Sequence, residues 1–282
     1  MKLLRYGAIG AEKPGLLDDS GTLRDLSGLV ADITGESLGD ATLEMLRGVD
    51  PRTLPEVTGT PRIGACVGNI GKFLCIGLNY SDHAAESGMA IPEHPILFFK
   101  ASSAVVGPND DVSMPRGSTA TDWEVELGVV IGSTCKYVSE DAALAHVAGY
   151  CVINDVSERN FQMHLSGQWT KGKSCDTFGP TGPWLVTRDE VPDVQNLSMS
   201  LDVNGTRMQT GSTQTMIFSV AKIVSHLSQL MTLHPGDVIS TGTPPGVGMG
   251  MKPAPVYLKK GDVMELTIEG LGHQRQTVTE DV

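Results

Sequence analysis

Short apolar runs separated by turn residues dominate the hydrophobic pattern of the chain, and such a pattern is typical of a strand-rich protein. Runs of this kind predict strands at residues 73–77, 123–131, 149–154, 238–241 and 263–268. Between two further apolar runs, the pair Asn204-Gly205 predicts a tight hairpin. The fold class that we expect is therefore mixed α+β and rich in strands.

Apolar residues at helical spacing predict two longer helices, each preceded by a serine that can cap it. The first follows Ser139, runs through Val147 and ends at Gly149. The second follows Ser219 and extends to Met231, with an apolar stripe along one side.

The first part of the chain is predicted to form a small module of its own. Its pattern predicts a strand at residues 2–6, a hairpin at 15–26 and a short helix near 43–47, followed by a link rich in Pro and Gly. A chain of 282 residues can hold one large core and a smaller domain. We therefore expect a small N-terminal α+β domain of residues 1–68 and a larger domain of residues 69–282.

The charge of the chain narrows the class of partner. It has 33 acidic and 21 basic residues, which gives a formal net charge of −12. This charge repels the phosphates of nucleic acids and anionic membranes, so we expect neither as a partner, and a small molecule instead. An acidic enzyme with an anionic substrate needs local positive charge, which a bound cation supplies.

The cysteines and the apolar runs indicate a compartment. No two of the five cysteines show a C-x-x-C spacing, which argues against a disulfide framework or a zinc ribbon and favours a reducing compartment. The first residues lack the apolar stretch of a signal peptide, and no run approaches the ~20 apolar residues of a membrane-spanning helix. We therefore expect a soluble, cytoplasmic protein.

Two glutamates in the predicted strand 123–131 are candidate metal ligands. Side chains alternate along a strand, so Glu124 and Glu126 share one face, with Cβ atoms roughly 7 Å apart, while Val125 and Leu127 face the core. Carboxylates this close repel each other unless a cation lies between them, and Mg²⁺ and Mn²⁺ prefer oxygen ligands. A strand that faces solvent with two glutamates is the alternative explanation.

A third carboxylate, Asp155, stands where the predicted strand 149–154 opens into a loop, a common position for functional groups. It can complete a metal site with the two glutamates. It can instead cap a helix over residues 157–165.

A histidine and a glutamate follow the strand at 73–77. If Ser81 or Asp82 begins a helix there, His83 and Glu86 stand three residues apart on one helical face. Glu86 can then orient the imidazole ring, whose other nitrogen can activate water. A surface ion pair is the simpler explanation of the same spacing.

Two loops offer groups that bind anions. Lys171 and Lys173 form a pair of cations that either bind an anionic substrate or merely face solvent. The Gly-rich segment 241–248 follows a strand and can hold a substrate carboxylate with backbone N–H groups and the Thr243 hydroxyl. Pro244 and Pro245 lack N–H donors, which argues against a dinucleotide-binding loop.

These segments occur together and in a fixed order, and the chain thereby resembles the fumarylacetoacetate hydrolase family over residues 69–282. The matching segments are 77–83, 124–128, 154–159, 171–173 and 241–248. The resemblance implies the mixed β-roll of that family, a homodimer and a Mg²⁺ or Mn²⁺ ion. The N-terminal module resembles the branch that acts on 2,4-diketo-3-deoxy sugar acids, such as those related to rhamnonate and fuconate.

The resemblance also implies roles for single residues. Glu124, Glu126 and Asp155 fall on the metal ligands, and His83 and Glu86 on a catalytic dyad in a helical lid. Lys173 falls on a residue with both a catalytic and a substrate-binding role. The other positions that fall at the substrate are Tyr80, Arg159, Gln162 and Thr243, of which Arg159 also supports the loop after Asp155 and Thr243 holds a carboxylate.

The expected reaction is the hydrolysis of the C3–C4 bond of a 2,4-diketo acid, which yields pyruvate and a short hydroxy acid. Relatives with the same ligands act as 2-oxo acid decarboxylases, enol–keto isomerases or a ureidoglycolate lyase, and a non-catalytic relative that only binds ligands is a further alternative. The segment 174–178 is longer than the one typical of acylpyruvate hydrolases, which leaves the pocket wall there open. A sugar acid is favoured because aromatic residues make up only 5% of the chain and because Gln162, Gln168, Thr170 and Ser174 offer partners for hydroxyl groups.

Overall fold

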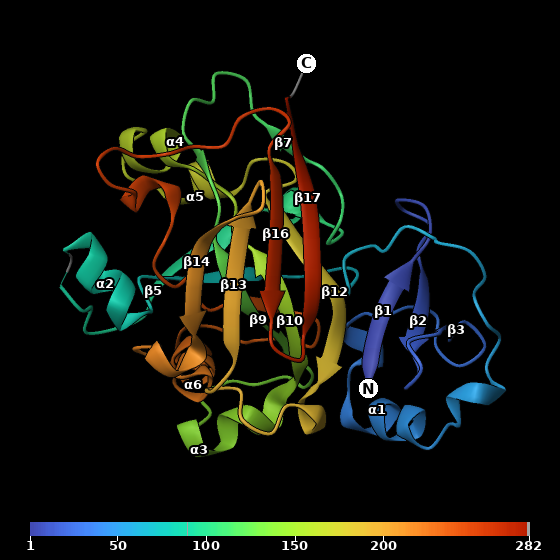
Figure 1. The fold of residues 1–282 in the computed structure, drawn as a ribbon. Coiled ribbons are helices and arrows are strands. Elements are labelled where there is room, and N and C mark those ends of the chain that lie inside the picture. The colour runs from blue at the N-terminus through green and yellow to red at the C-terminus, as the bar shows by residue number, and fades with distance from the viewer. Residues whose placement is uncertain (89, 281–282) are drawn as a thin grey trace.

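Two β-sheets form the framework of the computed structural model, which describes residues 1–88 and 90–280 (Figure 1). The strands of the larger sheet are β1 (Lys2–Tyr6), β2 (Lys13–Leu17), β3 (Leu23–Asp25), β4 (Phe73–Gly77), β5 (Ile96–Lys100), β6 (Val105–Val106), β9 (Val125–Ile131), β10 (Val147–Asn154), β12 (Gly179–Thr187) and β15 (Val238–Ser240). Their order is β3-β2-β1-β12-β10-β9-β15-β4-β5, and β6 pairs with β12.

The second sheet packs against the first and has the order β14-β13-β16-β17-β7. Its strands are β7 (Val112–Met114), β13 (Ser198–Val203), β14 (Thr206–Ser212), β16 (Val263–Ile268) and β17 (Gly272–Glu280). A small pair is formed by β8 (Thr121–Asp122) and β11 (Ser157–Glu158). The strand-rich α+β fold expected from the sequence is confirmed.

The α-helices are short and lie at the periphery (Figure 1). They are α1 (Asp40–Arg47), α2 (Ser81–Ser87), α3 (Glu140–Ala143), α4 (Arg159–His164), α5 (Thr170–Lys173) and α6 (Val220–Leu230). Within the described residues, no helix is both long and apolar enough to cross a membrane.

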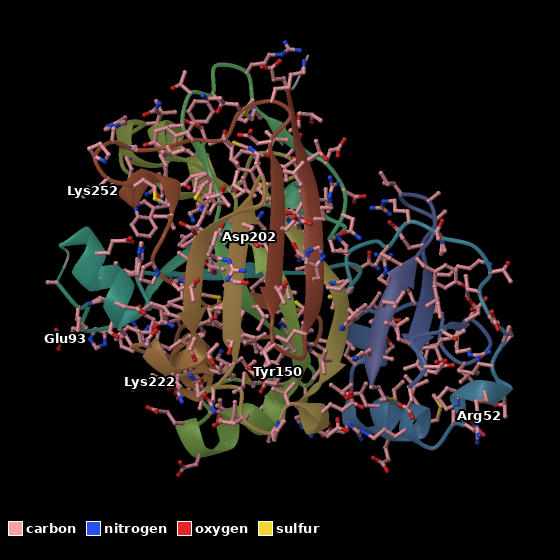
Figure 2. All side chains as sticks on the ribbon, viewed as in Figure 1. Arg52, Glu93, Tyr150, Asp202, Lys222 and Lys252 are labelled. Carbon is pink, nitrogen blue, oxygen red and sulfur yellow. The ribbon has the colours of Figure 1, made fainter. Side chains whose placement is uncertain are left out.

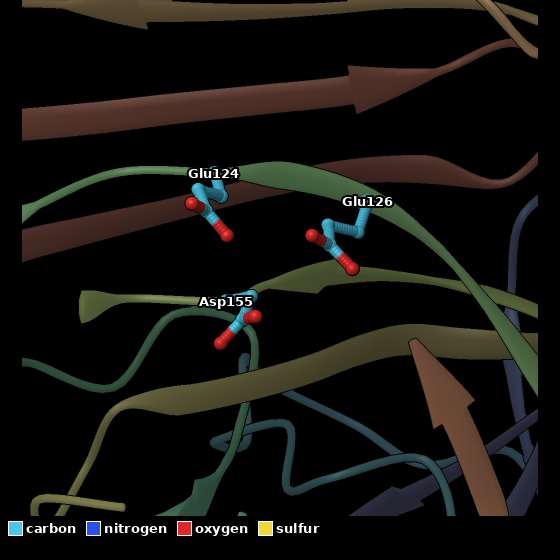
Figure 3. Close-up of side chains that lie close together, drawn as sticks. All are labelled: Glu124, Glu126 and Asp155. Atoms are coloured by element: carbon cyan, nitrogen blue, oxygen red, sulfur yellow. The ribbon is translucent and has the colours of Figure 1, made fainter. Parts of the chain in front are cut away.

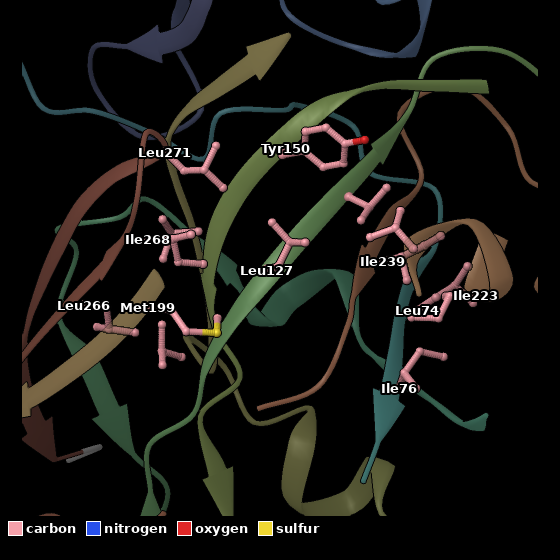
Figure 4. Packing of buried hydrophobic residues seen from close by; sticks show 14 of the residues in the cluster. Leu74, Ile76, Leu127, Tyr150, Met199, Ile223, Ile239, Leu266, Ile268 and Leu271 are labelled. Carbon is pink, nitrogen blue, oxygen red and sulfur yellow. The ribbon is translucent and has the colours of Figure 1, made fainter. Parts of the chain in front are cut away.

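The main core fills the space between the two sheets. Leu127 of β9 and Ile268 of β16 are fully buried in it, as is Ile223 of α6 (Figure 4). In contrast, charged side chains such as Arg52 and Lys222 project from the periphery (Figure 2). This core holds the strands that carry the candidate ligands in fixed positions.

The N-terminal module joins the larger sheet. Strand β1 pairs with β12, with Leu3 opposite Leu185. Leu3 and Leu43 are buried in one cluster with Val130 and Ile153 of the central strands. Residues 1–68 thus share both a sheet and a core with the rest of the chain, and the predicted boundary at residue 68 falls in the connection between β3 and β4.

The predicted helix after Ser139 is shorter than expected. Helix α3 ends at Ala143, a 3-10 turn follows at Leu144–His146, and Val147 already begins β10. Val147 pairs with Ile131 of β9, so pairing within the sheet prevails over the helical spacing of the apolar residues. The other prediction is confirmed, because α6 begins directly after Ser219, whose side chain accepts a hydrogen bond from the Lys222 amide.

The strand predicted at residues 123–131 begins later, at Val125. The Val125 amide donates to the Gln209 side chain instead of to a neighbouring strand. The hairpin predicted at Asn204-Gly205 is confirmed, because both residues have positive φ and connect β13 to β14.

Candidate active site

Three buried carboxylates converge where β9 and β10 lie side by side. Glu124 precedes β9, Glu126 lies within it, and Asp155 follows β10. The two glutamates extend from the same side of their segment toward Asp155 (Figure 3), and one carboxylate oxygen from each residue lies within 4.8 Å of the others. The sequence pattern therefore predicted their convergence correctly.

Among the described residues, Glu126 is the one of the three carboxylates without a basic partner to offset its negative charge. Its Oε2 accepts hydrogen bonds from the Ser240 hydroxyl (2.6 Å) and the Gly242 amide (2.9 Å). Among the described residues, no lysine or arginine lies within ion-pair distance of it, although it is only 2% exposed. Burial, with the nearby charges of Asp155 and Glu124, raises the pKa of Glu126 well above its ordinary value.

Glu124 has two basic partners. Lys173 Nζ donates to its Oε2 at 2.6 Å, and an Arg159 terminal nitrogen donates to its Oε1 at 2.7 Å. Burial would raise the pKa of Glu124, but these two cations outweigh it and lower the pKa to about 2. Burial likewise opposes the charge of Lys173, yet Asp155 and Glu124 raise its pKa, so the lysine stays protonated.

Asp155 lies behind Lys173. Its Oδ2 accepts from Lys173 Nζ at 2.8 Å, and its Oδ1 lies 2.6 Å from Lys100 Nζ without accepting a hydrogen bond. Asp155 does not cap the following helix, because Glu158 is the N-cap of α4. Three buried carboxylates thus form the all-oxygen donor set that a hard divalent ion requires.

The predicted dyad lies in α2. His83 Nδ1 is 3.2 Å from Glu86 Oε2, which confirms the expected spacing of one helical turn. The same Glu86 oxygen accepts a hydrogen bond from the Gly246 amide at 3.2 Å. Glu86 thus connects the histidine to the glycine-rich loop after β15.

One cavity of about 280 Å³ brings most of the predicted residues together. A cavity of this size suits a small ligand. The predicted residues that line the cavity are His83, Glu86, Glu124, Glu126, Arg159, Gln162, Lys173 and Thr243.

Several other expected residues do not line this cavity. Tyr80 is fully buried, and its hydroxyl contacts the Met199 sulfur at 3.2 Å, so we leave it out of the proposed substrate contacts. Gln168 and Thr170 line a separate surface hollow, and the Ser174 hydroxyl accepts a hydrogen bond from the Ala101 amide. The exposed Lys171 donates to the Leu165 carbonyl group, so the loop contributes only one of its two cations, Lys173, to the site.

The glycine-rich loop binds carboxylates of the protein itself, although we expected it to hold a substrate carboxylate. The Gly242 amide donates to Glu126, the Gly246 amide to Glu86, and the Gly248 and Met249 amides to Asp122. The Thr243 side chain lines the cavity, but its hydroxyl donates to the Val125 carbonyl group. The loop therefore positions carboxylate side chains of the candidate site through its backbone.

Sequence reasoning missed two buried residues that position the site. Asp122 accepts from Arg159 Nε at 2.8 Å and so orients the guanidinium group toward Glu124. Lys100 donates to the Val156 carbonyl group and pairs with Asp155. Asp122 stood next to the Glu-x-Glu pattern as a possible signal, whereas Lys100 lies on a distant strand and offered none.

Comparisons with known proteins agree with this geometry. The sequence pattern of the fumarylacetoacetate (FAA) hydrolase C-terminal family matches residues 72–279. A Burkholderia ambifaria protein is 63% identical over 277 residues, which are 98% of each chain. Its name describes it as a hydrolase and gives no substrate.

Two solved structures have the same fold over the whole of both chains. A fumarylacetoacetate hydrolase from Exiguobacterium antarcticum is 38% identical, with a TM-score of 0.85. A maleylpyruvate hydrolase from Sphingobium sp. SYK-6, solved with manganese(II) and pyruvate, is 28% identical, with a TM-score of 0.82.

The chain belongs to the fumarylacetoacetate hydrolase family. The family and the buried cluster of Glu124, Glu126 and Asp155 together support a metal-dependent enzyme of this family, a hydrolase or a close relative of one.

Proposed function

We propose that this enzyme hydrolyses the C3–C4 bond of a 2,4-diketo acid and releases pyruvate and a second carboxylic acid. The observation that carries the proposal is that a His–Glu dyad and a protonated lysine bound to two carboxylates face one small cavity. In this reaction the hydroxyl group of water adds to C4, which becomes the new carboxylic acid. The remaining proton goes to C3, which becomes the methyl group of pyruvate.

Glu124, Glu126 and Asp155 would hold the divalent ion, which supplies a Lewis acid for the carboxylate and 2-oxo group of the substrate. A Mg²⁺ or Mn²⁺ ion suits these oxygen ligands. The relative solved with manganese(II) and pyruvate supports both the ion and the three-carbon product.

His83 is the proposed general base. Its Nδ1 faces the Glu86 carboxylate, which favours the tautomer with the proton on Nδ1, and in that tautomer Nε2 is the basic nitrogen that can accept a proton from water. Lys173 is held protonated beside the carboxylates and can neutralise negative charge that develops on the substrate. Arg159, Gln162 and Thr243 line the same cavity and are the proposed substrate contacts.

The resemblance of the N-terminal module supports a finer proposal, a 2,4-diketo-3-deoxy sugar acid. The small volume of the cavity also favours a short substrate. Among the polar side chains that we expected to bind its hydroxyl groups, Gln162 lines the cavity, whereas Gln168, Thr170 and Ser174 lie elsewhere.

A coupled assay for pyruvate over a panel of 2,4-diketo acids tests the proposal. We expect Mn²⁺- or Mg²⁺-dependent pyruvate release that a chelator abolishes and that fresh metal restores. The panel includes a 2,4-diketo-3-deoxy sugar acid beside simple acylpyruvates, since a site built for hydroxyl groups disfavours the analogue that lacks them. Equal turnover of the simple acylpyruvates would refute the sugar acid. Decarboxylation or isomerisation of a 2-oxo acid without C–C hydrolysis would refute the hydrolase.

A further inference from the structure

Part of the cavity wall is apolar. Beside its charged residues, the cavity is lined by Phe98, Met163, Trp169, Val247 and Met249. The low aromatic content of the whole chain gave no indication of this wall, because two of its few aromatic residues lie here. A wall of this composition favours an apolar group of a ligand.

Trp169 is placed by the same turn that places Lys173. The Trp169 carbonyl group accepts hydrogen bonds from the Gly172 and Lys173 amides, at 3.0 and 3.1 Å. Trp169 has helical backbone angles at the start of α5, so it and Lys173 lie four residues apart on one helical face. Both side chains line the cavity.

Aromatic packing connects Trp169 to the carboxylate cluster. The Trp169 ring meets Phe98 edge to face, with 5.5 Å between ring centroids. Lys173 Nζ lies 5.1 Å from the centroid of the Phe98 ring and contacts Glu124 and Asp155. A ligand anchored at the carboxylates and extending past Lys173 therefore meets this aromatic pair.

Gly77 makes room for the Trp169 ring. A Cβ atom at Gly77 would lie 2.3 Å from Trp169 Cζ3 and 3.0 Å from Cη2, which is closer than such atoms can approach. Gly77 ends β4 and is itself part of the cavity wall. The position of the indole ring thus depends on the absence of a side chain at residue 77.

We propose that Trp169, seated on Gly77, determines specificity by packing against an apolar part of the substrate beyond its 2-oxo acid group, such as the terminal methyl group of a 6-deoxy sugar acid. The inference rests on the proposed function only in that a 2-oxo acid is anchored at the carboxylate cluster. It does not depend on which bond the enzyme breaks.

Binding of straight-chain 2-oxo acids tests the proposal without turnover. Pyruvate, 2-oxobutanoate, 2-oxopentanoate and 2-oxohexanoate are titrated by calorimetry into the Mn²⁺-loaded protein. Each methylene that packs on the wall should increase affinity by roughly three- to fourfold. In Trp169→Ala this increase should be largely lost, whereas pyruvate affinity and manganese content stay unchanged. Phe99→Ala is the matched control, because Phe99 directly follows Phe98 on β5 but does not line this cavity.

A double-mutant cycle separates the effect of the position of the indole ring from a general loss of structure in the cavity. Gly77→Ala should displace the indole ring and so reduce the gain per methylene, but it should have little further effect in the Trp169→Ala background. Trp169→Phe should retain part of the gain.

The outcomes distinguish the two proposals. The role of Trp169 would be overturned if affinity does not increase along the series in the wild type, or if none of the four acids binds detectably. It would also be overturned if the increase in affinity per methylene is unchanged in Trp169→Ala. A retained, Trp169-dependent gain in a protein that cleaves no diketo acid would support Trp169 and overturn only the hydrolase.

Discussion

Glu126 is buried in the protein interior with two hydrogen-bond donors and no basic partner among the described residues. Its pKa is raised in the folded protein by burial and by Asp155 and Glu124. The folded state therefore binds a proton at this residue more tightly than the unfolded state does. It follows that this carboxyl group destabilises the metal-free protein progressively as pH rises above the ordinary range of a glutamate pKa.

We predict that Glu126→Gln removes this loss of stability. The melting temperature of the metal-free variant should fall less than that of the wild type between pH 5 and pH 8. Manganese at 100 times its Kd should raise the wild-type melting temperature by roughly 5–10 °C and leave the variant unchanged. Glu93→Gln, which changes an exposed carboxylate, should behave like the wild type. Stoichiometric manganese in Glu126→Gln would contradict the assignment of this ligand.

His83→Ala tests the proposed base. Loss of a general base typically lowers kcat by ~10²–10⁴, and manganese content should not change, because the imidazole ring is no part of the carboxylate cluster. Single-turnover kinetics with plasma emission analysis of bound metal would measure both quantities. His94→Ala provides a control on a nearby exposed histidine. Normal turnover in His83→Ala would point to an isomerase or a decarboxylase.

Individual residues of the site differed in how well the sequence indicated them. Glu124 and Glu126 were predictable because alternation along a strand is a local rule, and His83 and Glu86 because helical spacing is another. Lys100 and Trp169 were not, since each reaches the site only through tertiary packing. The Trp169 wall also shows that overall composition is a poor guide to the composition of one cavity.

At the scale of elements, the loop after β15 connects three parts of the site. Its amides hold Glu126 of β9, Glu86 of α2 and Asp122, which in turn orients Arg159. The backbone of this loop requires glycine at residue 246, because its φ is +102° and a Cβ atom there would lie 2.0 Å from the Met208 carbonyl oxygen.

We predict that Gly246→Ala costs both stability and activity. Gly261→Ala is the matched control, since Gly261 also has a positive φ of +90° but no neighbour within 4 Å of the added Cβ atom. Backbone strain alone should lower the free energy of unfolding of Gly261→Ala by about 1–3 kcal/mol. Gly246→Ala should lose more, with a large fall in kcat, and denaturant unfolding would measure the difference. Equal losses in the two variants would show that the contact with Met208 is unimportant.

Most elements were predictable where a local pattern decided them. The strands β4 and β16 and the cap of α6 follow from apolar runs and a serine at the right place. The helix predicted through Val147 was wrong because pairing with β9 is a long-range interaction that the sequence does not display. The order of the strands in the two sheets could not be predicted for the same reason.

At the scale of the whole molecule, the N-terminal module shares a sheet and a buried cluster with the rest of the chain. We therefore predict one cooperative transition in calorimetry of the full chain. Residues 69–282 produced alone should unfold at a much lower temperature or aggregate, because removal of β1 exposes the edge of β12. Two separate transitions, or a fragment as stable as the full chain, would instead support an independent domain at residues 1–68.

Assembly is a second prediction at this scale. A symmetric dimer is the commonest soluble oligomer, and the family resemblance implies one. Multi-angle light scattering at micromolar concentration should give twice the 29.9 kDa mass of the chain. A mass of one chain would refute the dimer and leave the proposed reaction unaffected, because the described site is built from residues of a single chain.

The loop amides after β15 also bear on directed evolution of this enzyme. Four of them are already bonded to Glu86, Asp122 and Glu126, so a library that randomises the loop would disturb α2, Arg159 and a proposed metal ligand at once. Met163 of α4 and Trp169, directly before α5, also lie on the cavity wall, and neither side chain takes part in those bonds. Variants with new substrate preferences are therefore best sought at Met163 and Trp169, where changes alter the shape of the cavity and spare its charged residues.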